Sequence, residues 1–204
     1  LYNFPSNPTG ATLTPEQRDD LLDFARRHHL WIITDEVYDR IVYDVEHVSF
    51  LGTGYNRTLM INSFSKTFAM TGWRIGYICS PNTEAMSQII KMQYYITACS
   101  NDAMQYAVLT AFDEASTYPE EMAKEFQARR DLICSRLNSM PGVSCHIPKG
   151  AFYVFPKVEV PGLNSQELAI ELLKGGGLTS PGSAFGKSGE GHLRFAYTVS
   201  REDI

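Results

Sequence analysis

The 204-residue sequence predicts an α/β fold, and three observations carry that prediction. A helix signal over residues 15–29 leads directly into an apolar run at 30–34, which is half of a β-α-β unit. That run and a second one at 58–61 are continuously apolar, as is typical of strands covered on both faces. From residue 141 onward the pattern changes to short strands separated by turns. We therefore expect an α/β part followed by a smaller α+β part.

The first helix has a clear beginning, and the strand after it ends in an acid. Thr14 stands before Pro15 and three positions before Gln17, which predicts an N-cap, a proline at the first helical position and a capping box. The next strand ends at Asp35. In open α/β sheets the carboxyl ends of the strands are where ligands bind. Asp35 is therefore a candidate functional residue, although capping a turn would explain it equally well.

Four further helices and several short strands are expected along the rest of the chain. Apolar spacing, caps and stops predict the helices at 82–97, 102–115, 119–140 and 166–174. Short strands are predicted at 143–147 and 152–155, joined as a hairpin or meander by a turn at 148–150, and at 178–180 and 192–198. We place the domain boundary inside the long helix, so that residues 1–120 form the larger part and 121–204 the smaller one.

Composition and charge exclude several function classes. The net charge is −5 and lysine and arginine do not cluster, which argues against nucleic acid as a partner. No apolar run approaches the roughly 20 residues that cross a bilayer, so we expect no membrane partner. The four cysteines, Cys79, Cys99, Cys134 and Cys145, have neither metal-ligand spacing nor the density of a disulfide framework. We expect no metal site, reduced thiols and a cytoplasmic location.

A polar segment between two apolar runs carries the strongest chemical signal. Lys66 and Arg74 lie between the runs at 58–61 and 75–79, with Ser63 just before the lysine. Burial disfavours the ammonium form of a lysine, and a neutral lysine is a nucleophile toward carbonyl compounds, pyridoxal 5′-phosphate (PLP) among them. Arginine keeps its charge, and its planar fork suits a phosphate or carboxylate. Taken alone, both charges could equally be solvated at the rim of a strand–turn–strand unit.

Asp35 and Lys66 follow two successive strands, so we expect them at the same edge of the sheet. An acid, a lysine, a tyrosine and an arginine around one crevice match the needs of a PLP site. The acid keeps the pyridine nitrogen protonated, the lysine forms an imine, and the arginine with nearby hydroxyls holds the phosphate.

Five short motifs occur together in a fixed order. They are Asn7–Gly10, Asp35–Tyr38, Ser63–Lys66, Thr71–Tyr77 and Gly189–Ala196. In this order and spacing they resemble the fold-type I PLP enzymes, and most of all the class I and II aminotransferases of the aspartate and aromatic kind. The resemblance covers nearly the whole chain. It implies a large PLP-binding domain with a mostly parallel sheet and helices on both faces, followed by a small C-terminal domain.

The resemblance implies a role for each matching residue at the reacting centre. Lys66 would form the Schiff base with PLP and carry the proton between substrate and cofactor. Asp35 would pair with the pyridinium nitrogen. Tyr38 and Asn7 would hydrogen-bond the ring 3′-oxygen, which favours the neutral form of the imine.

Other matching residues would hold the charged groups of cofactor and substrate. Ser63 and Arg74 would bind the phosphate. Arg194 would hold the substrate α-carboxylate bidentately, with Asn7 as a second substrate contact. Without the resemblance, Arg194 could equally be a strand-edge arginine in a surface ion pair.

The activity that the resemblance implies is a ping-pong aminotransferase of amino-acid metabolism. An amino acid (aspartate, glutamate or an aromatic one) would pass its amino group to a 2-oxo acid, in a full-length protein that is a homodimer. In the family, a glycine- and serine-rich phosphate loop and an aromatic residue that stacks on the cofactor ring lie upstream of the Asn7 motif. We therefore expect the chain to be the C-terminal portion of a longer protein, with its last helix cut after Ile204.

Three alternatives stay open at this point. A PLP-dependent lyase, acting on carbon–sulfur bonds or forming aminocyclopropane carboxylate, shares the lysine, aspartate and tyrosine, although the run from Ala69 to Arg74 favours transaminases. An effector-binding domain is a second alternative, since domains that resemble aminotransferases serve as effector sensors in some transcription regulators. A non-catalytic homologue is a third alternative, against which the intact Lys66, Asp35 and Arg74 argue.

Overall fold

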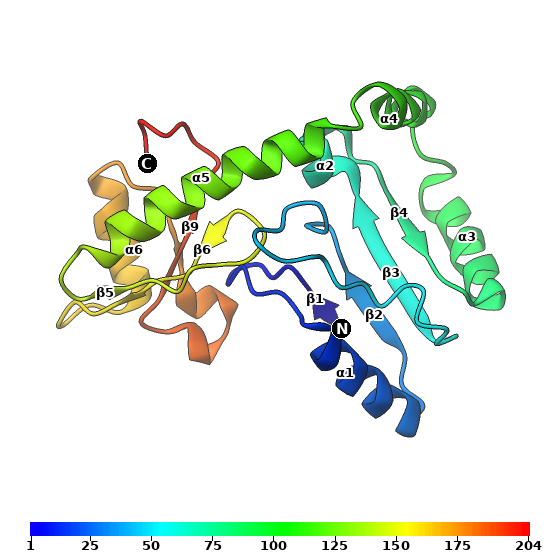
Figure 1. Cartoon of the computed structure of the whole chain (residues 1–204), viewed down its shortest axis with the longest axis horizontal. Coiled ribbons are helices and arrows are strands. Elements are labelled where there is room, and N and C mark those ends of the chain that lie inside the picture. The colour runs from blue at the N-terminus through cyan, green and yellow to red at the C-terminus, as the bar shows by residue number, and fades with distance from the viewer.

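The computed structural model describes residues 1–204 as two groups of elements connected by one long helix (Figure 1). The first group contains β1 (Tyr2–Asn3), α1 (Pro15–Arg27), β2 (Ile32–Asp35), β3 (Thr58–Ser63), α2 (Phe64–Thr67), β4 (Gly76–Cys79), α3 (Thr83–Thr97) and α4 (Asp102–Glu114). The connecting helix is α5 (Tyr118–Asn138). The second group contains β5 (Val143–Ser144), β6 (Tyr153–Val154), β7 (Lys157–Val158), α6 (Ser165–Lys174), β8 (Ser180–Pro181) and β9 (Leu193–Ala196). The domain boundary at residue 120 falls near the start of α5 and stays a prediction.

The first group is built on a four-stranded mixed sheet in the order β1-β2-β3-β4. The first three strands are parallel, and β4 runs antiparallel to β3. Asn3 is in register with Asp35, and Asp35 with Ile61, so the carboxyl ends of the three parallel strands meet at one edge. The predicted α/β class with a mostly parallel sheet is confirmed.

Helix α1 begins as the sequence predicts and covers one face of this sheet. The Thr14 hydroxyl accepts from the Gln17 N–H and the Gln17 side chain accepts from the Thr14 N–H, which completes the capping box. Leu22 of this helix packs in a cluster with Ile32 and Phe50. Along β2 and β3 fully buried residues alternate with partly buried ones, so one face of these strands is more deeply buried than the other.

The predicted hairpin between 143–147 and 152–155 is wrong. Strand β5 pairs with β7, whereas β6 pairs with β9, which also pairs with β8. The turn at 148–150 is bound to the first group of elements, because the N–H groups of Lys149 and Gly150 both donate to the Gly10 carbonyl at 3.0 Å. The Lys149 carbonyl in turn accepts from the Tyr43 N–H at 2.8 Å. The turn therefore docks onto the first group instead of closing a local hairpin.

The main core joins the two groups. Its buried residues come from the segment after β2, from α5, from the strand region around β6 and from β9: Tyr38, Ile41, Tyr43, Cys134, Leu137, Cys145, Ala151, Phe152, Tyr153, Val154 and Tyr197. The hydroxyls of Tyr43 and Tyr197 both donate to the Ala151 carbonyl, at 2.5 and 3.1 Å. Packing between the two groups of elements therefore fixes the carboxyl edge of the four-stranded sheet against β6 and β9.

The helices at 83–97, 102–114, 118–138 and 165–174 confirm the predicted ones to within two residues at each end. None of them combines the length and the apolar character that crossing a membrane requires. All four cysteines are free thiols.

Candidate functional site

The carboxyl edge of the sheet presents Asp35 and Ser63 on neighbouring parallel strands. The backbone continues the pairing beyond Asp35, since the Glu36 N–H donates to the Ile61 carbonyl at 2.9 Å. The Asp35 carboxylate accepts the Val37 N–H at Oδ1, 3.2 Å away. One oxygen of Asp35 thus holds the turn that follows β2, which leaves Oδ2 for a ligand.

Helix α2 starts directly at the end of β3 and carries Lys66. Ser63 is its N-cap, since its hydroxyl accepts from the Ser65 N–H at 3.1 Å. The same hydroxyl lies 3.0 Å from the Ile75 carbonyl, so the cap also ties the segment that carries Arg74 to the end of β3. A four-residue helix in this place brings the Lys66 side chain to the same edge as Asp35.

The Lys66 amine sits against two aromatic rings. Its Nζ lies 5.2 Å from the ring centre of Phe152 and 5.9 Å from that of Tyr38. Partial burial lowers the pKa of Lys66 from its ordinary value, and the positive charge of Arg74 lowers it further. The lysine therefore has a larger neutral, nucleophilic fraction near pH 7 than a solvated lysine has.

Tyr38 is buried, and its hydroxyl lies 3.0 Å from the hydroxyl of Tyr153. Burial raises the pKa of Tyr38, and the hydrogen bond with Tyr153 and the negative charge of Asp35 raise it further, against a smaller opposing effect of Arg194. Tyr38 therefore stays a neutral phenol at physiological pH, with one proton to donate.

Arg194, on β9, is held in place from both groups of elements. Its Nη1 donates to Asn7 Oδ1 at 2.8 Å, and its Nη2 donates to the Ser180 hydroxyl at 3.0 Å. The guanidinium also stacks 4.7 Å above the ring centre of Tyr153 and 5.1 Å from that of Phe185. Its Nε is buried without a hydrogen-bond partner. Arg194 is thus a preorganised cation with a donor to spare, which suits a carboxylate.

Arg74 has a different environment from Arg194. It is exposed, adopts a left-handed conformation with φ of 55°, and donates from Nη1 to the Thr71 carbonyl at 2.8 Å. Its guanidinium is accessible to an anion from solution, and its positive charge adds to the effect of burial in lowering the pKa of Lys66.

The structure brings most of the predicted residues into one connected set. The Lys66 amine lies over the ring of Tyr38, and the Tyr38 hydroxyl is hydrogen-bonded with the hydroxyl of Tyr153. The ring of Tyr153 in turn lies against the guanidinium of Arg194, which donates to Asn7.

Asp35, Ser63 and Arg74 border this set on the sheet edge and on the loop after α2. The roles of all seven predicted residues stay predictions.

Sequence reasoning missed Phe152, Tyr153 and Ser180. In the sequence the Phe152–Tyr153 pair indicates only a strand, because an aromatic pair in a short apolar run is the normal pattern of a core strand. The signal that could have identified it is the pair's position just after the turn at 148–150, whose docking onto Gly10 places it beside Tyr38.

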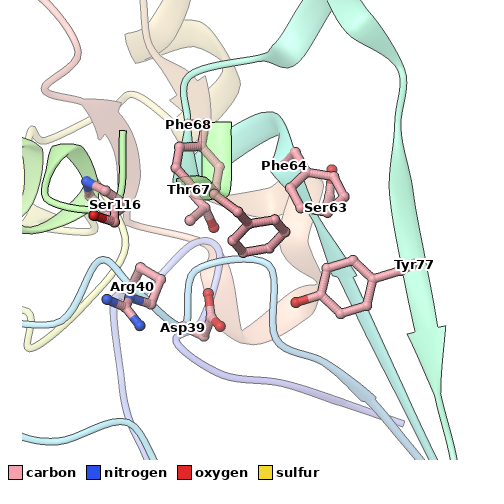
Figure 2. A pocket seen from close by; sticks show the side chains of 10 residues that line it. Asp39, Arg40, Ser63, Phe64, Thr67, Phe68, Tyr77 and Ser116 are labelled. Atoms are coloured by element: carbon pink, nitrogen blue, oxygen red, sulfur yellow. The ribbon is translucent and has the colours of Figure 1, made fainter. Parts of the chain in front are cut away.

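A separate cavity of about 280 Å³ lies beside Ser63 (Figure 2). Of the predicted site residues only Ser63 lines it, together with Phe64 and Thr67 of α2. Figure 2 shows Asp39 and the Tyr77 hydroxyl facing each other across this cavity. Burial raises the pKa of Asp39, whose Oδ1 has no hydrogen-bond partner. This cavity is distinct from the set that contains Lys66.

The chain is similar to known proteins along its whole length. The family model of aminotransferase class I and II matches residues 1–204, the whole chain. The chain is 41% identical to an aspartate aminotransferase of Pyrococcus abyssi, over 100% of this chain and 54% of the relative. It is 40% identical to aromatic-amino-acid aminotransferase 2 of Thermococcus litoralis, over the same shares of each.

A solved structure shows the same arrangement of the backbone. The aromatic aminotransferase of Pyrococcus horikoshii OT3 superposes with a TM-score of 0.92 at 42% identity, over 98% of this chain and 55% of that one. The chain thus spans about half the length of the curated relatives it matches. On the match along its full length and on these relatives, the chain belongs to the aminotransferase class I and II family.

Proposed function

We propose that the protein containing this chain is a PLP-dependent aminotransferase that moves an amino group between an amino acid and a 2-oxo acid by a ping-pong mechanism. The observation that carries this proposal is the connected set from Lys66 to Arg194 and Asn7. In this set a lysine of lowered pKa and an arginine held by Asn7 and Tyr153 lie at two ends of one group of neighbouring side chains, which supports the proposal.

The donor set fits PLP, the cofactor on which the family generally depends. A partly neutral amine (Lys66) suits its aldehyde, and the free carboxylate oxygen of Asp35 suits its ring nitrogen. The protonated Tyr38 hydroxyl suits its phenolic oxygen. The exposed guanidinium of Arg74 and the hydroxyl of Ser63 suit its phosphate. When bound, PLP supplies a carbonyl that condenses with amines and a ring that accepts electrons from the substrate Cα.

The chain's own residues perform the remaining work. Lys66 would take the proton from the substrate Cα at Nζ and pass it to the cofactor, which requires the neutral amine that its surroundings favour. Asp35 holds the proton on the ring nitrogen by its negative charge. Tyr38 donates its single proton to the phenolic oxygen.

Arg194 and Asn7 orient the substrate. Two N–H groups of one guanidinium bind both oxygens of a carboxylate, which fixes the plane of that group. The hydrogen bond to Asn7 and the stacking on Tyr153 hold the guanidinium before substrate arrives, which lowers the entropy cost of binding.

The relatives support the substrate class. Those named above act, by name, on aspartate and on aromatic amino acids. We therefore propose aspartate, glutamate or an aromatic amino acid as donor. A cytoplasmic homodimer with a role in amino-acid biosynthesis is proposed on the resemblance to the family alone.

A paired product assay tests the proposal against the lyase alternative. The complete protein that carries these residues is incubated with PLP, a donor amino acid and 2-oxoglutarate, and both products are quantified. A transaminase forms the new keto acid and glutamate in equal amounts and needs the acceptor. Release of ammonia or a thiol without acceptor would establish the lyase instead. The Lys66→Ala variant is the control for turnover that does not depend on the site.

A further inference from the structure

Tyr153 lies at the junction between the two ends of the site. It is 7% exposed, it belongs to β6, and it faces Tyr38 across the connection between the two groups of elements. Its hydroxyl meets the Tyr38 hydroxyl at 3.0 Å, while its ring lies 4.7 Å beneath the Arg194 guanidinium. One side chain thus contacts both a residue proposed to act on the cofactor and the residue proposed to bind the substrate.

We propose that Tyr153 is a positioning residue: its hydroxyl donates to Tyr38 and so directs the Tyr38 proton toward the cofactor, while its ring supports Arg194. The proposal rests on the proposed function, because it assigns Tyr153 a part in the same site.

A count of protons fixes the direction of the hydrogen bond between the two phenols. Each phenol has one proton to donate and an oxygen that accepts. If Tyr38 gives its proton to the phenolic oxygen of the cofactor, it has none left for Tyr153. The 3.0 Å contact then requires Tyr153 to be the donor. A hydroxyl that accepts a hydrogen bond becomes a stronger donor, since hydrogen bonds in a chain polarise one another.

Few groups around Tyr38 other than Tyr153 could donate a hydrogen bond to its hydroxyl oxygen. The charged and titratable groups that face it are Asp35 on its own segment, Lys66 on α2, and Arg194 with Tyr153 from the second group. Asp35 is an acceptor, and the Lys66 amine and the Arg194 guanidinium act on Tyr38 through their charge or ring contact. In the cofactor-free protein either hydroxyl can be the donor; once Tyr38 donates to the cofactor, Tyr153 is the neighbour whose proton can reach the Tyr38 oxygen.

The ring of Tyr153 contributes separately from its hydroxyl. The guanidinium of Arg194 is held at its edges by Asn7 and Ser180, and on its flat face by the ring of Tyr153. Such a cation–π contact contributes about 0.5–2 kcal/mol, depending on how far the pair is desolvated, which corresponds to a roughly twofold to thirtyfold effect on binding. The two parts of the side chain can therefore be separated by mutation.

Tyr153→Phe tests the hydroxyl in the complete PLP-loaded protein. The readout is the pH midpoint of the absorbance change of the bound cofactor, which reports on the hydrogen bond to its phenolic oxygen. We expect the midpoint to rise by a few tenths of a unit to about one unit, because a weaker Tyr38 donor stabilises the deprotonated form less. Binding of maleate, a dicarboxylate without an amino group, should be unchanged because the ring remains.

Tyr197→Phe is the matched control. Tyr197 is buried in the same core and loses a hydrogen bond of similar length, that to the Ala151 carbonyl at 3.1 Å, without touching Tyr38. The pH midpoint of the cofactor absorbance in the Tyr197→Phe variant should equal that of the unmodified protein. Tyr153→Leu removes the ring as well, and we expect both a raised midpoint and a maleate dissociation constant raised roughly twofold to thirtyfold.

The outcomes separate this inference from the proposed function. A cofactor band that titrates normally, with a midpoint that Tyr153→Phe leaves unchanged or lowers, overturns the role of Tyr153 alone. An equal shift in Tyr197→Phe also overturns it, since the effect would then belong to the core in general. Absence of a cofactor band in the unmodified protein, although PLP is present, overturns the proposed function and this inference together.

Discussion

The Arg194 guanidinium donates a 2.8 Å hydrogen bond to the side-chain oxygen of Asn7, 187 positions earlier in the chain. This bond connects β9 of the second group to the loop that follows β1 of the first. It joins the two residues that the sequence proposes as substrate contacts. The proposed carboxylate-binding end of the site therefore forms only when both groups of elements are packed together.

Replacing Arg194 by lysine should weaken substrate binding strongly. A lysine keeps the charge but cannot donate to Asn7 and Ser180 while also binding both oxygens of a carboxylate. We expect kcat/KM to fall roughly tenfold or more, which matches the loss of one charge-assisted hydrogen bond. Steady-state kinetics with an amino-acid donor measure the effect. Arg201→Lys, in an exposed pair with Glu125, is the control and should leave kcat/KM unchanged.

Replacing Arg74 by glutamine should raise the pKa of Lys66 in the cofactor-free protein. Burial is the first cause of the lowered lysine pKa and the charge of Arg74 is the second, so removing that charge removes part of the shift. At a fixed pH near neutrality, the variant should label more slowly at Lys66 in reductive methylation, which modifies the neutral amine. Labelling of Lys187 serves as an internal reference. Equal or faster labelling of Lys66 would show that Arg74 does not act on it.

A buried carboxylate behind the site predicts a dependence of stability on pH. The Glu36 carboxylate, with a side chain only 4% exposed, accepts from the Thr34 hydroxyl and the Phe50 N–H and lies 2.8 Å from His47 Nε2. Burial alone would raise the pKa of Glu36, but the hydrogen bonds from His47 and Ser49 outweigh it, and the pKa is lowered. The stability that this carboxylate contributes is present above its unfolded pKa, close to 4.5, and is lost as the pH falls through the folded value.

Glu36→Gln tests this expectation. The variant should be less stable than the unmodified protein near pH 7, by roughly 1–3 kcal/mol, and the difference should shrink as the pH falls below about 4.5. Urea unfolding at a series of pH values gives the free energies. Asp19→Asn, in an exposed pair with Arg18, should show little difference at any pH. A stability difference between Glu36→Gln and the unmodified protein that grows toward low pH would contradict the predicted pH dependence.

The docking of the turn at 148–150 depends on Gly10, which has a φ of +66°. A Cβ at this position would overlap Pro148 and lie 2.7 Å from the Gly150 carbonyl oxygen. We expect Gly10→Ala to destabilise the protein by roughly 2–5 kcal/mol, from backbone strain together with overpacking. Gly52→Ala, where φ is +84° and no atom lies within 4 Å, isolates the strain, at roughly 1–2 kcal/mol. Thermal unfolding measures the loss of stability in both variants. Equal losses in Gly10→Ala and Gly52→Ala would show that the close contact of Gly10 with the turn at 148–150 contributes nothing beyond backbone strain.

Local signals made the elements predictable. The capping boxes at Thr14 and Asn164 and the cap at Asn82 depend on hydrogen bonds within three residues, so the sequence contains all that is needed to recognise them. The edge of the parallel sheet was equally predictable, because strands that end in Asp35 and Ser63 meet there by the geometry of the fold.

Contacts between distant segments were not predictable from local pattern. The turn at 148–150 resembles a hairpin turn, but its N–H groups donate to Gly10, and only the packed structure shows that. The same docking brings Phe152 to Lys66 and Tyr153 to Tyr38. An aromatic side chain at a core position and one at a functional site give the same sequence pattern, so Tyr153 could be recognised only from its contacts.

The most direct test of the account is the position at which the cofactor becomes attached. The complete protein that carries these residues is loaded with PLP, reduced with borohydride, digested and analysed by mass spectrometry. We expect one phosphopyridoxyl group on the peptide that contains Lys66, and none in the Lys66→Ala variant. Attachment to a different lysine, or full transaminase turnover in Lys66→Ala, would contradict the assignment of Lys66 and with it the proposed site.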